Sequence, residues 1–218
     1  MRKRNNKTMT ITAHTGCVGT KENSLEAIEK GVEYGAQIVE FDVRYHNGKP
    51  VLSHDEPKGG EVTLEEAFLK IKEYDGLKVN VDIKSVEYLH TVGEVAEKTG
   101  VKDRIFFTGI NDDFVAAAKK ECPDIEYYLN VSVLPARKQT DEYLDFLVEK
   151  VKNSGAVGIN FNKKSATKRL VEVFHKNGLL VSIWTVNGYF KICKITSFGP
   201  DNITTRRPDR LKKFLDER

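Results

Sequence analysis

Short apolar segments that suit β-strands alternate with amphipathic helical segments along almost the whole 218-residue chain. Strands that alternate with helices are typical of βαβ units, which build a parallel sheet. The predicted strands are residues 10–14, 37–43, 78–83, 104–108, 126–129, 156–160, 180–184 and 202–204. Eight such units favour a closed (β/α)₈ TIM barrel, a single α/β domain, over an open doubly wound sheet.

Sequence signals indicate where several of the intervening helices begin. Asn23 and Thr63 each stand three residues before a glutamate, the pattern of a capping box, and Pro208 suits the first turn of the last helix. The predicted helices are residues 24–34, 64–72, 86–98, 112–121, 141–153, 165–176, 188–196 and 208–215.

The composition describes one ordinary globular domain. Hydrophobic residues at 39% and charged residues at 31% argue against a disordered or membrane-embedded chain. No apolar run approaches the ~20 residues of a transmembrane helix. Residues 1–8 are basic and lack the apolar region of a signal peptide. We therefore expect a basic N-terminal arm at 1–8, a barrel at 9–218 and a cytoplasmic location.

Charge and cysteine content exclude further classes. The 35 basic and 32 acidic residues leave a net charge of +3, too balanced to predict a nucleic-acid partner. The widely spaced Cys17, Cys122 and Cys193 indicate neither a zinc site nor a disulfide framework. Free thiols suit a reducing cytoplasm. His175 lies in a helical context and is predicted at the surface. The oligomeric state is left open.

Three carboxylates lie in two predicted strands, and a lysine directly follows the second of these strands. Glu40 and Asp42 are two residues apart, as are Asp82 and Lys84, so each pair should project from one face of its strand. In a barrel, functional residues gather at the C-terminal ends of the strands. A Glu-x-Asp pair could also be a salt-bridged structural pair, but convergence at one rim favours a site.

Two histidines are predicted at the same rim. His14 ends the first strand, and His54 follows an extended segment at residues 50–53. Carboxylate oxygens suit a hard cation such as Mg²⁺ or Ca²⁺, which can polarise a phosphoryl oxygen. One imidazole can take a proton from a nucleophile while the other gives one to a leaving alcohol. This combination favours cleavage of a phosphodiester.

The ordered motifs resemble the glycerophosphodiester phosphodiesterase family, whose fold is this barrel. The resemblance spans nearly the whole chain. The matching segments are His14-Thr15-Gly16, Glu22-Asn23-Ser24, Glu40-Phe41-Asp42-Val43, Gly48-Lys49-Pro50-Val51, His54-Asp55, Asp82-Ile83-Lys84, Trp184-Thr185-Val186-Asn187 and Ile203-Thr204-Thr205-Arg206-Arg207-Pro208.

The resemblance implies hydrolysis of a glycerophosphodiester to glycerol 3-phosphate and an alcohol. It implies a divalent cation, Mg²⁺ or Ca²⁺, held by three carboxylates, with two histidines as acid and base. It also implies one lysine that helps bind phosphate and one tryptophan that walls the pocket beside the glycerol. The three carboxylates are Glu40, Asp42 and Asp82, and the two histidines are His14 and His54. The lysine is Lys84 and the tryptophan is Trp184. Which histidine is the base, and whether water or the substrate's neighbouring hydroxyl attacks first, stay open.

The chain departs from the family pattern in three places. Thr15 stands where the family has a phosphate-gripping arginine, and a hydroxyl cannot replace a guanidinium. Arg44 shares strand parity with Glu40 and is our candidate for partial compensation. Asp82 replaces a glutamate, which shortens that ligand by one methylene. The insertion after the second strand is nearly absent, with residues 55–62 remaining, which predicts an open pocket.

Two alternatives accompany this interpretation. One is the same chemistry on another phosphodiester, of the teichoic-acid or lysophospholipid type. The other is a barrel that binds a phosphorylated ligand without turning it over, for which Thr15 is the main support. A small-molecule phosphodiester is the expected partner of the enzyme in the leading interpretation.

Overall fold

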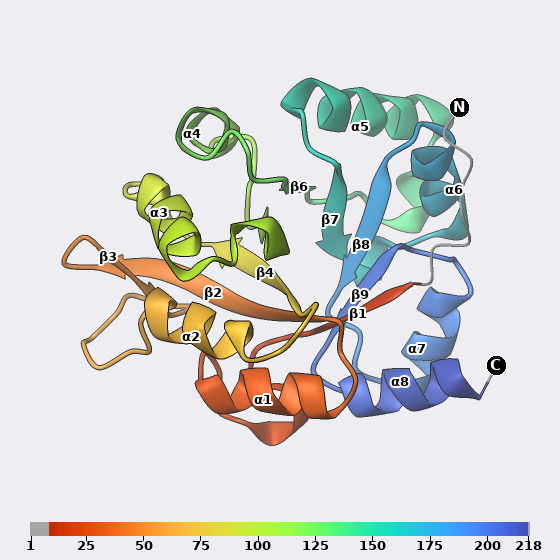
Figure 1. Ribbon diagram of the computed structural model, residues 1–218. Helices are drawn as coiled ribbons and strands as arrows, with labels where there is room; N and C mark the ends of the chain where they lie inside the picture. Colours follow the sequence, from red (N-terminus) through yellow and green to blue (C-terminus); the bar gives the residue numbers. More distant parts are fainter. Residues whose placement is uncertain (1–8, 218) are drawn as a thin grey trace.

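The computed structural model describes residues 9–217 and has the predicted single-domain barrel, with its helices arranged around the strands (Figure 1). The predicted arm at residues 1–8 lies outside the described residues. The barrel strands are β1 (Thr10–Ala13), β2 (Ile38–His46), β4 (Lys78–Ile83), β5 (Ile105–Thr108), β6 (Tyr128–Asn130), β7 (Gly158–Asn162), β8 (Leu180–Trp184) and β9 (Asn202–Thr205). The helices are α1 (Leu25–Glu33), α2 (Leu64–Lys72), α3 (Leu89–Thr99), α4 (Val115–Glu121), α5 (Asp141–Ser154), α6 (Lys168–Lys176), α7 (Tyr189–Thr196) and α8 (Pro208–Asp216).

The barrel strands are parallel and run in the order β5-β4-β2-β1-β9-β8-β7-β6. Between the two ends of this path, Phe107 and Tyr127 form a parallel bridge, and the Asn130 amide donates to the Ile110 carbonyl at 2.7 Å. The barrel is therefore nearly closed. Parallel strands place all their C-terminal ends at one rim, where the predicted functional residues lie.

An additional strand, β3 (Lys49–Leu52), pairs antiparallel with β2 and lies outside the barrel path. The hairpin turn contains Asn47 and Gly48, whose φ angles of 50° and 74° suit a tight two-residue connection. The sequence predicts only an extended segment here. After the hairpin, the Ser53 amide donates to the Asp42 carbonyl at 3.1 Å, so the chain returns His54 to the rim.

The barrel interior contains buried polar side chains that bond one another. The Thr12 hydroxyl donates to Asn202 Oδ1 at 2.8 Å, and Asn202 Nδ2 donates to Ser182 Oγ at 3.0 Å. Asn160 Nδ2 donates to Asn130 Oδ1 at 3.0 Å. These bonds offset much of the cost of removing polar groups from water and fix the side chains beneath the rim.

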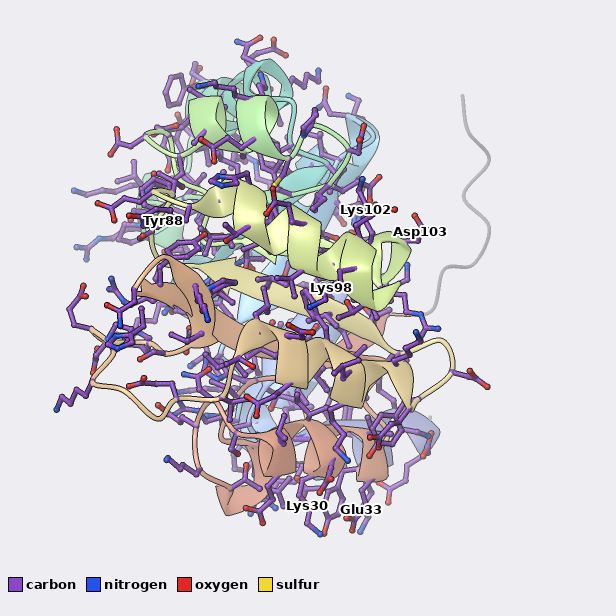
Figure 2. All side chains as sticks on the ribbon, turned by 60° about the vertical axis from the view of Figure 1, so that its left-hand side comes forward. Lys30, Glu33, Tyr88, Lys98, Lys102 and Asp103 are labelled. Carbon is purple, nitrogen blue, oxygen red and sulfur yellow. The ribbon has the colours of Figure 1, made fainter. Side chains whose placement is uncertain are left out.

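The opposite faces of the strands are apolar and pack against the helices. Phe41 on β2 lies against Phe68 on α2, with ring centroids 6.2 Å apart. Figure 2 shows α1, α2 and α3 side by side, with Lys98 of α3 directed toward α2, where it pairs with Glu65 at 2.7 Å. Exposed pairs of this kind contribute little, so burial of apolar surface stabilises the helix layer.

The structure corrects several sequence expectations. Ser24, not Asn23, caps α1, and the helices predicted from residues 86 and 165 begin at Leu89 and Lys168. The predicted helix at 112–121 begins only at Val115, because Asn111 Oδ1 accepts from the amides of Asp113 and Phe114 and holds a turn before it. His175 is not a surface residue: its side chain is 10% exposed, and its Nε2 lies 2.7 Å from Asp201 Oδ2. Among residues 9–217, no helix has the length and apolar character that a membrane crossing requires.

The helix layer gives a stability prediction. Replacing fully buried Phe68 with Ala removes the ring that covers Phe41, and we expect a loss of about 3–5 kcal/mol in the free energy of unfolding. The neighbouring Leu69 is 49% exposed, so Leu69→Ala should cost less than about 1 kcal/mol. Urea unfolding followed by circular dichroism measures both values. Equal losses in the two variants would contradict this packing.

Candidate active site

The predicted carboxylates meet where β2 runs beside the end of β4. In the parallel register of these strands, Asp42 lies opposite Asp82, and Glu40 lies opposite Asn80. Carboxylate oxygens of Glu40, Asp42 and Asp82 all lie within 4.8 Å of one another. The strand parity read from the sequence therefore brings the three carboxylates together as expected.

Lys84 joins two of these carboxylates. Its Nζ lies 2.9 Å from Asp42 Oδ1 and 2.5 Å from Asp82 Oδ2. Burial of Lys84 opposes its charge, but the charges of Asp82 and Asp42 outweigh burial, and the pKa of the ammonium group is raised. Lys84 therefore stays protonated and partly offsets the repulsion among the acids.

Neighbouring groups fix each carboxylate. The Thr15 amide donates to Glu40 Oε2 at 2.9 Å. Asn23 makes a reciprocal pair with Asp42: its Nδ2 donates to Asp42 Oδ2 and its Oδ1 accepts from the Asp42 amide, both at 3.0 Å. The Thr108 hydroxyl lies 2.8 Å from Asp82 Oδ1. Such supporting bonds hold potential ligands in one orientation.

The site favours a divalent cation. Burial raises the pKa of Glu40 well above its usual value, and the charges of Asp42 and Asp82 raise it further. Three hard oxygen donors in a buried, mutually repelling group match the donor chemistry that Mg²⁺ and Ca²⁺ prefer. The residues present therefore fit such an ion, which would relieve the repulsion.

His14 and His54 both line the same cavity as the carboxylates. His14 Nδ1 lies 2.9 Å from the Thr15 carbonyl oxygen, which can only accept, so Nδ1 carries the proton and Nε2 keeps its lone pair. Burial lowers the pKa of His14, which favours this neutral form. His54 is 62% exposed, and its Nδ1 lies 2.9 Å from Asp55 Oδ1.

The cavity has a volume of about 540 Å³. Its walls bring together all seven residues singled out from the sequence as functional: His14, Glu40, Asp42, His54, Asp82, Lys84 and Trp184. Two buried polar atoms in the walls, Trp184 Nε1 and Asn160 Oδ1, have no hydrogen-bond partner among residues 9–217.

Part of the cavity wall was not predicted from the sequence. Asn130 and Asn160 line it, on β6 and β7. Arg206 also lines it, and its position directly after a predicted strand was the available signal. Arg44 is not among the lining residues. Its Nε donates to the His54 carbonyl at 2.9 Å and its Nη1 pairs with Glu56, so it supports the His54 loop instead.

Gly109, which directly follows β5, allows the backbone to pass close to Ile83 and Asp82 at the end of β4. Its φ is +77°, and a Cβ there would stand 2.2 Å from the Ile83 carbonyl oxygen and 2.9 Å from Asp82 Oδ1. Only glycine permits both the backbone conformation and the close approach. The position of Asp82 therefore depends on a residue without a side chain.

Comparisons with known proteins agree with this architecture. The model of the glycerophosphoryl diester phosphodiesterase family matches residues 7–63 and 61–210. A glycerophosphodiester phosphodiesterase of Bacillus altitudinis is 27% identical over 249 residues, which cover 95% of this chain and 98% of that protein. An uncharacterized protein of Bacillus subtilis, YqiK, is 25% identical over 246 residues, which cover 94% and 98%.

Solved structures share the fold. An Oleispira antarctica phosphodiesterase in complex with the product sn-glycerol-3-phosphate superposes with a TM-score of 0.79 at 21% identity, covering 95% of this chain and 96% of that one. A Parabacteroides distasonis glycerophosphodiester phosphodiesterase gives 0.78 at 19% identity, covering 97% and 98%. The barrel and the family match define a phosphoric diester hydrolase. The chain belongs to the glycerophosphoryl diester phosphodiesterase family.

The close approach at Gly109 is testable. Gly109→Ala combines a left-handed backbone with a clash against Ile83, and we expect a loss of about 2–5 kcal/mol in the free energy of unfolding. Gly76 has a φ of +71°, and a Cβ added there would meet no atom within 4 Å, so Gly76→Ala should lose only about 1–2 kcal/mol. Urea denaturation of both variants separates the clash from the backbone effect. A Gly109→Ala loss no greater than that of Gly76→Ala would contradict the close approach.

Proposed function

We propose that the protein hydrolyses glycerophosphodiesters to glycerol 3-phosphate and an alcohol, using a divalent cation and two histidines. The observation that carries the proposal is the convergence of three carboxylates, Lys84 and two histidines on one cavity. The family match supports the same substrate class. The product named for the Oleispira antarctica structure, sn-glycerol-3-phosphate, is the product we propose here.

Glu40, Asp42 and Asp82 would hold the cation, Mg²⁺ or Ca²⁺. When bound, such a cation supplies electrophilic assistance to a phosphoryl oxygen. Lys84 keeps Asp42 and Asp82 in place and adds positive charge beside the phosphate. Trp184 forms part of the wall that would face the glycerol.

We assign the base to His14 and the acid to His54. Its lowered pKa keeps His14 neutral, so the Nε2 lone pair is available to accept a proton from the attacking oxygen. His54 lies on an exposed loop where an alcohol can depart, and the contact of its Nδ1 with Asp55 would orient the ring. The attacking oxygen belongs to water or to the substrate's neighbouring hydroxyl. Trapping of a cyclic phosphate would identify the second route.

The test is hydrolysis of glycerophosphocholine with Mg²⁺, with Ca²⁺ and with EDTA. Activity should require the cation, and His14→Ala and His54→Ala should each lower kcat by about 10²–10⁴-fold. His90 is an exposed histidine on α3 that pairs with Glu121 and does not line this cavity, so His90→Ala should keep full activity.

The outcomes separate the alternatives. Full activity in EDTA, or an unaffected His14→Ala variant, would contradict the proposed mechanism. Cation-dependent cleavage of other diesters without cleavage of glycerophosphocholine would select a different leaving group for the same chemistry.

A further inference from the structure

Among residues 9–217, two basic side chains besides the histidines line the cavity, Lys84 and Arg206. Lys84 directs its ammonium group at Asp42 and Asp82. Four carboxylates line the same cavity, those three of the proposed cation site and Glu22, so a phosphate anion meets more negative than positive side chains. Arg206 therefore supplies positive charge that would offset these carboxylates when an anion binds.

Short contacts on both sides fix the backbone of Arg206 at the end of β9. The Arg206 amide donates to Asn187 Oδ1 at 2.9 Å, and its carbonyl accepts from the Val18 amide at 2.9 Å. The neighbouring Thr205 carbonyl accepts from the His14 amide at 2.9 Å. Arg206 is thus anchored directly beside the strand that carries His14.

The guanidinium group covers the backbone of Thr15. Arg206 Nε donates to the Thr15 carbonyl at 3.3 Å, and Nη2 pairs with Glu22. No bond to Nη1 is present among residues 9–217, and the side chain is 41% exposed. The group is therefore oriented by two contacts and retains N–H donors for a ligand.

The Thr15 side chain cannot bind an anion in the cavity. It is 2% exposed and absent from the cavity wall, and its hydroxyl accepts from the Asn23 amide. The side chain at position 15 therefore supports the loop before α1. A guanidinium reaches this position from the residue after β9, across the strand pair β1–β9.

We propose that Arg206 binds the charged phosphate oxygens of substrate and product, replacing from β9 the guanidinium that the family pattern places at position 15. It would approach from the side of His14 opposite the carboxylates of β2 and β4. Glu22 and the Thr15 carbonyl hold it in this orientation. A planar guanidinium suits phosphate because it offers paired donors in a fixed geometry. This assignment rests on the proposed function for its substrate class.

The test compares adjacent arginines. Arg206→Gln keeps an N–H donor near the Thr15 carbonyl but removes the charge. Arg207 pairs with Asp209, with Nε 2.9 Å from Oδ1, and does not line the cavity, so Arg207→Gln is the matched control. The measurement is the Kd for sn-glycerol 3-phosphate by calorimetry, with EDTA and with Mg²⁺, alongside kcat and KM for glycerophosphocholine.

We expect Arg206→Gln to weaken product binding by about 10- to 100-fold in both conditions, and Arg207→Gln to change it less than about twofold. KM should rise in Arg206→Gln, and millimolar guanidinium ion should restore part of the lost affinity in that variant alone. Thermal unfolding of the variants confirms that each is folded.

Unchanged product affinity in Arg206→Gln would overturn the assignment, as would equal losses in the two variants. A lower kcat at unchanged product affinity would also overturn it and would show a positioning role toward His14. If the wild type binds the product through Arg206 yet cleaves no diester, the proposed function fails while this assignment stands.

Discussion

The main constraint on the site is the mutual repulsion of three carboxylates on the paired strands β2 and β4. Oxygens of buried Glu40 and Asp42 and of partly buried Asp82 lie within 4.8 Å of one another, an arrangement that costs free energy unless positive charge offsets it. Lys84 supplies part of that charge. The supporting bonds from Thr15, Asn23 and Thr108 keep the carboxylates together despite the repulsion. Such stored repulsion is a reason for a site to bind a cation tightly.

The barrel follows from the same strands that build the site. One face of β2 is apolar and buries Phe41 against α2, while the other presents Glu40 and Asp42 to the cavity. This division requires the two-residue periodicity of a strand, so fold and site are specified together. Polar residues continue below the rim, where Thr12, Asn202 and Ser182 bond one another inside the barrel.

Periodicity and parity allowed prediction of the strands and of the convergence of carboxylates. They could not reveal contacts between residues distant in sequence. Arg44 has the parity of Glu40, yet the β3 hairpin gives it the His54 carbonyl and Glu56 as partners. Barrel closure implies that β9 pairs with β1, but the contacts of the Arg206 guanidinium with Thr15 and Glu22 follow from no local pattern. His175 likewise finds a buried partner in Asp201, 26 residues away in the chain.

The most direct test of the account is the binding of Mn²⁺, an oxygen-preferring probe ion, followed by electron paramagnetic resonance. The wild type should bind one equivalent at the three carboxylates. Asp82→Asn should lose that binding, whereas Asp112→Asn, at an exposed aspartate that pairs with Lys150, should keep it. Failure of the wild type to bind Mn²⁺, or equal binding by Asp82→Asn, would contradict the claim that this cluster is a cation site.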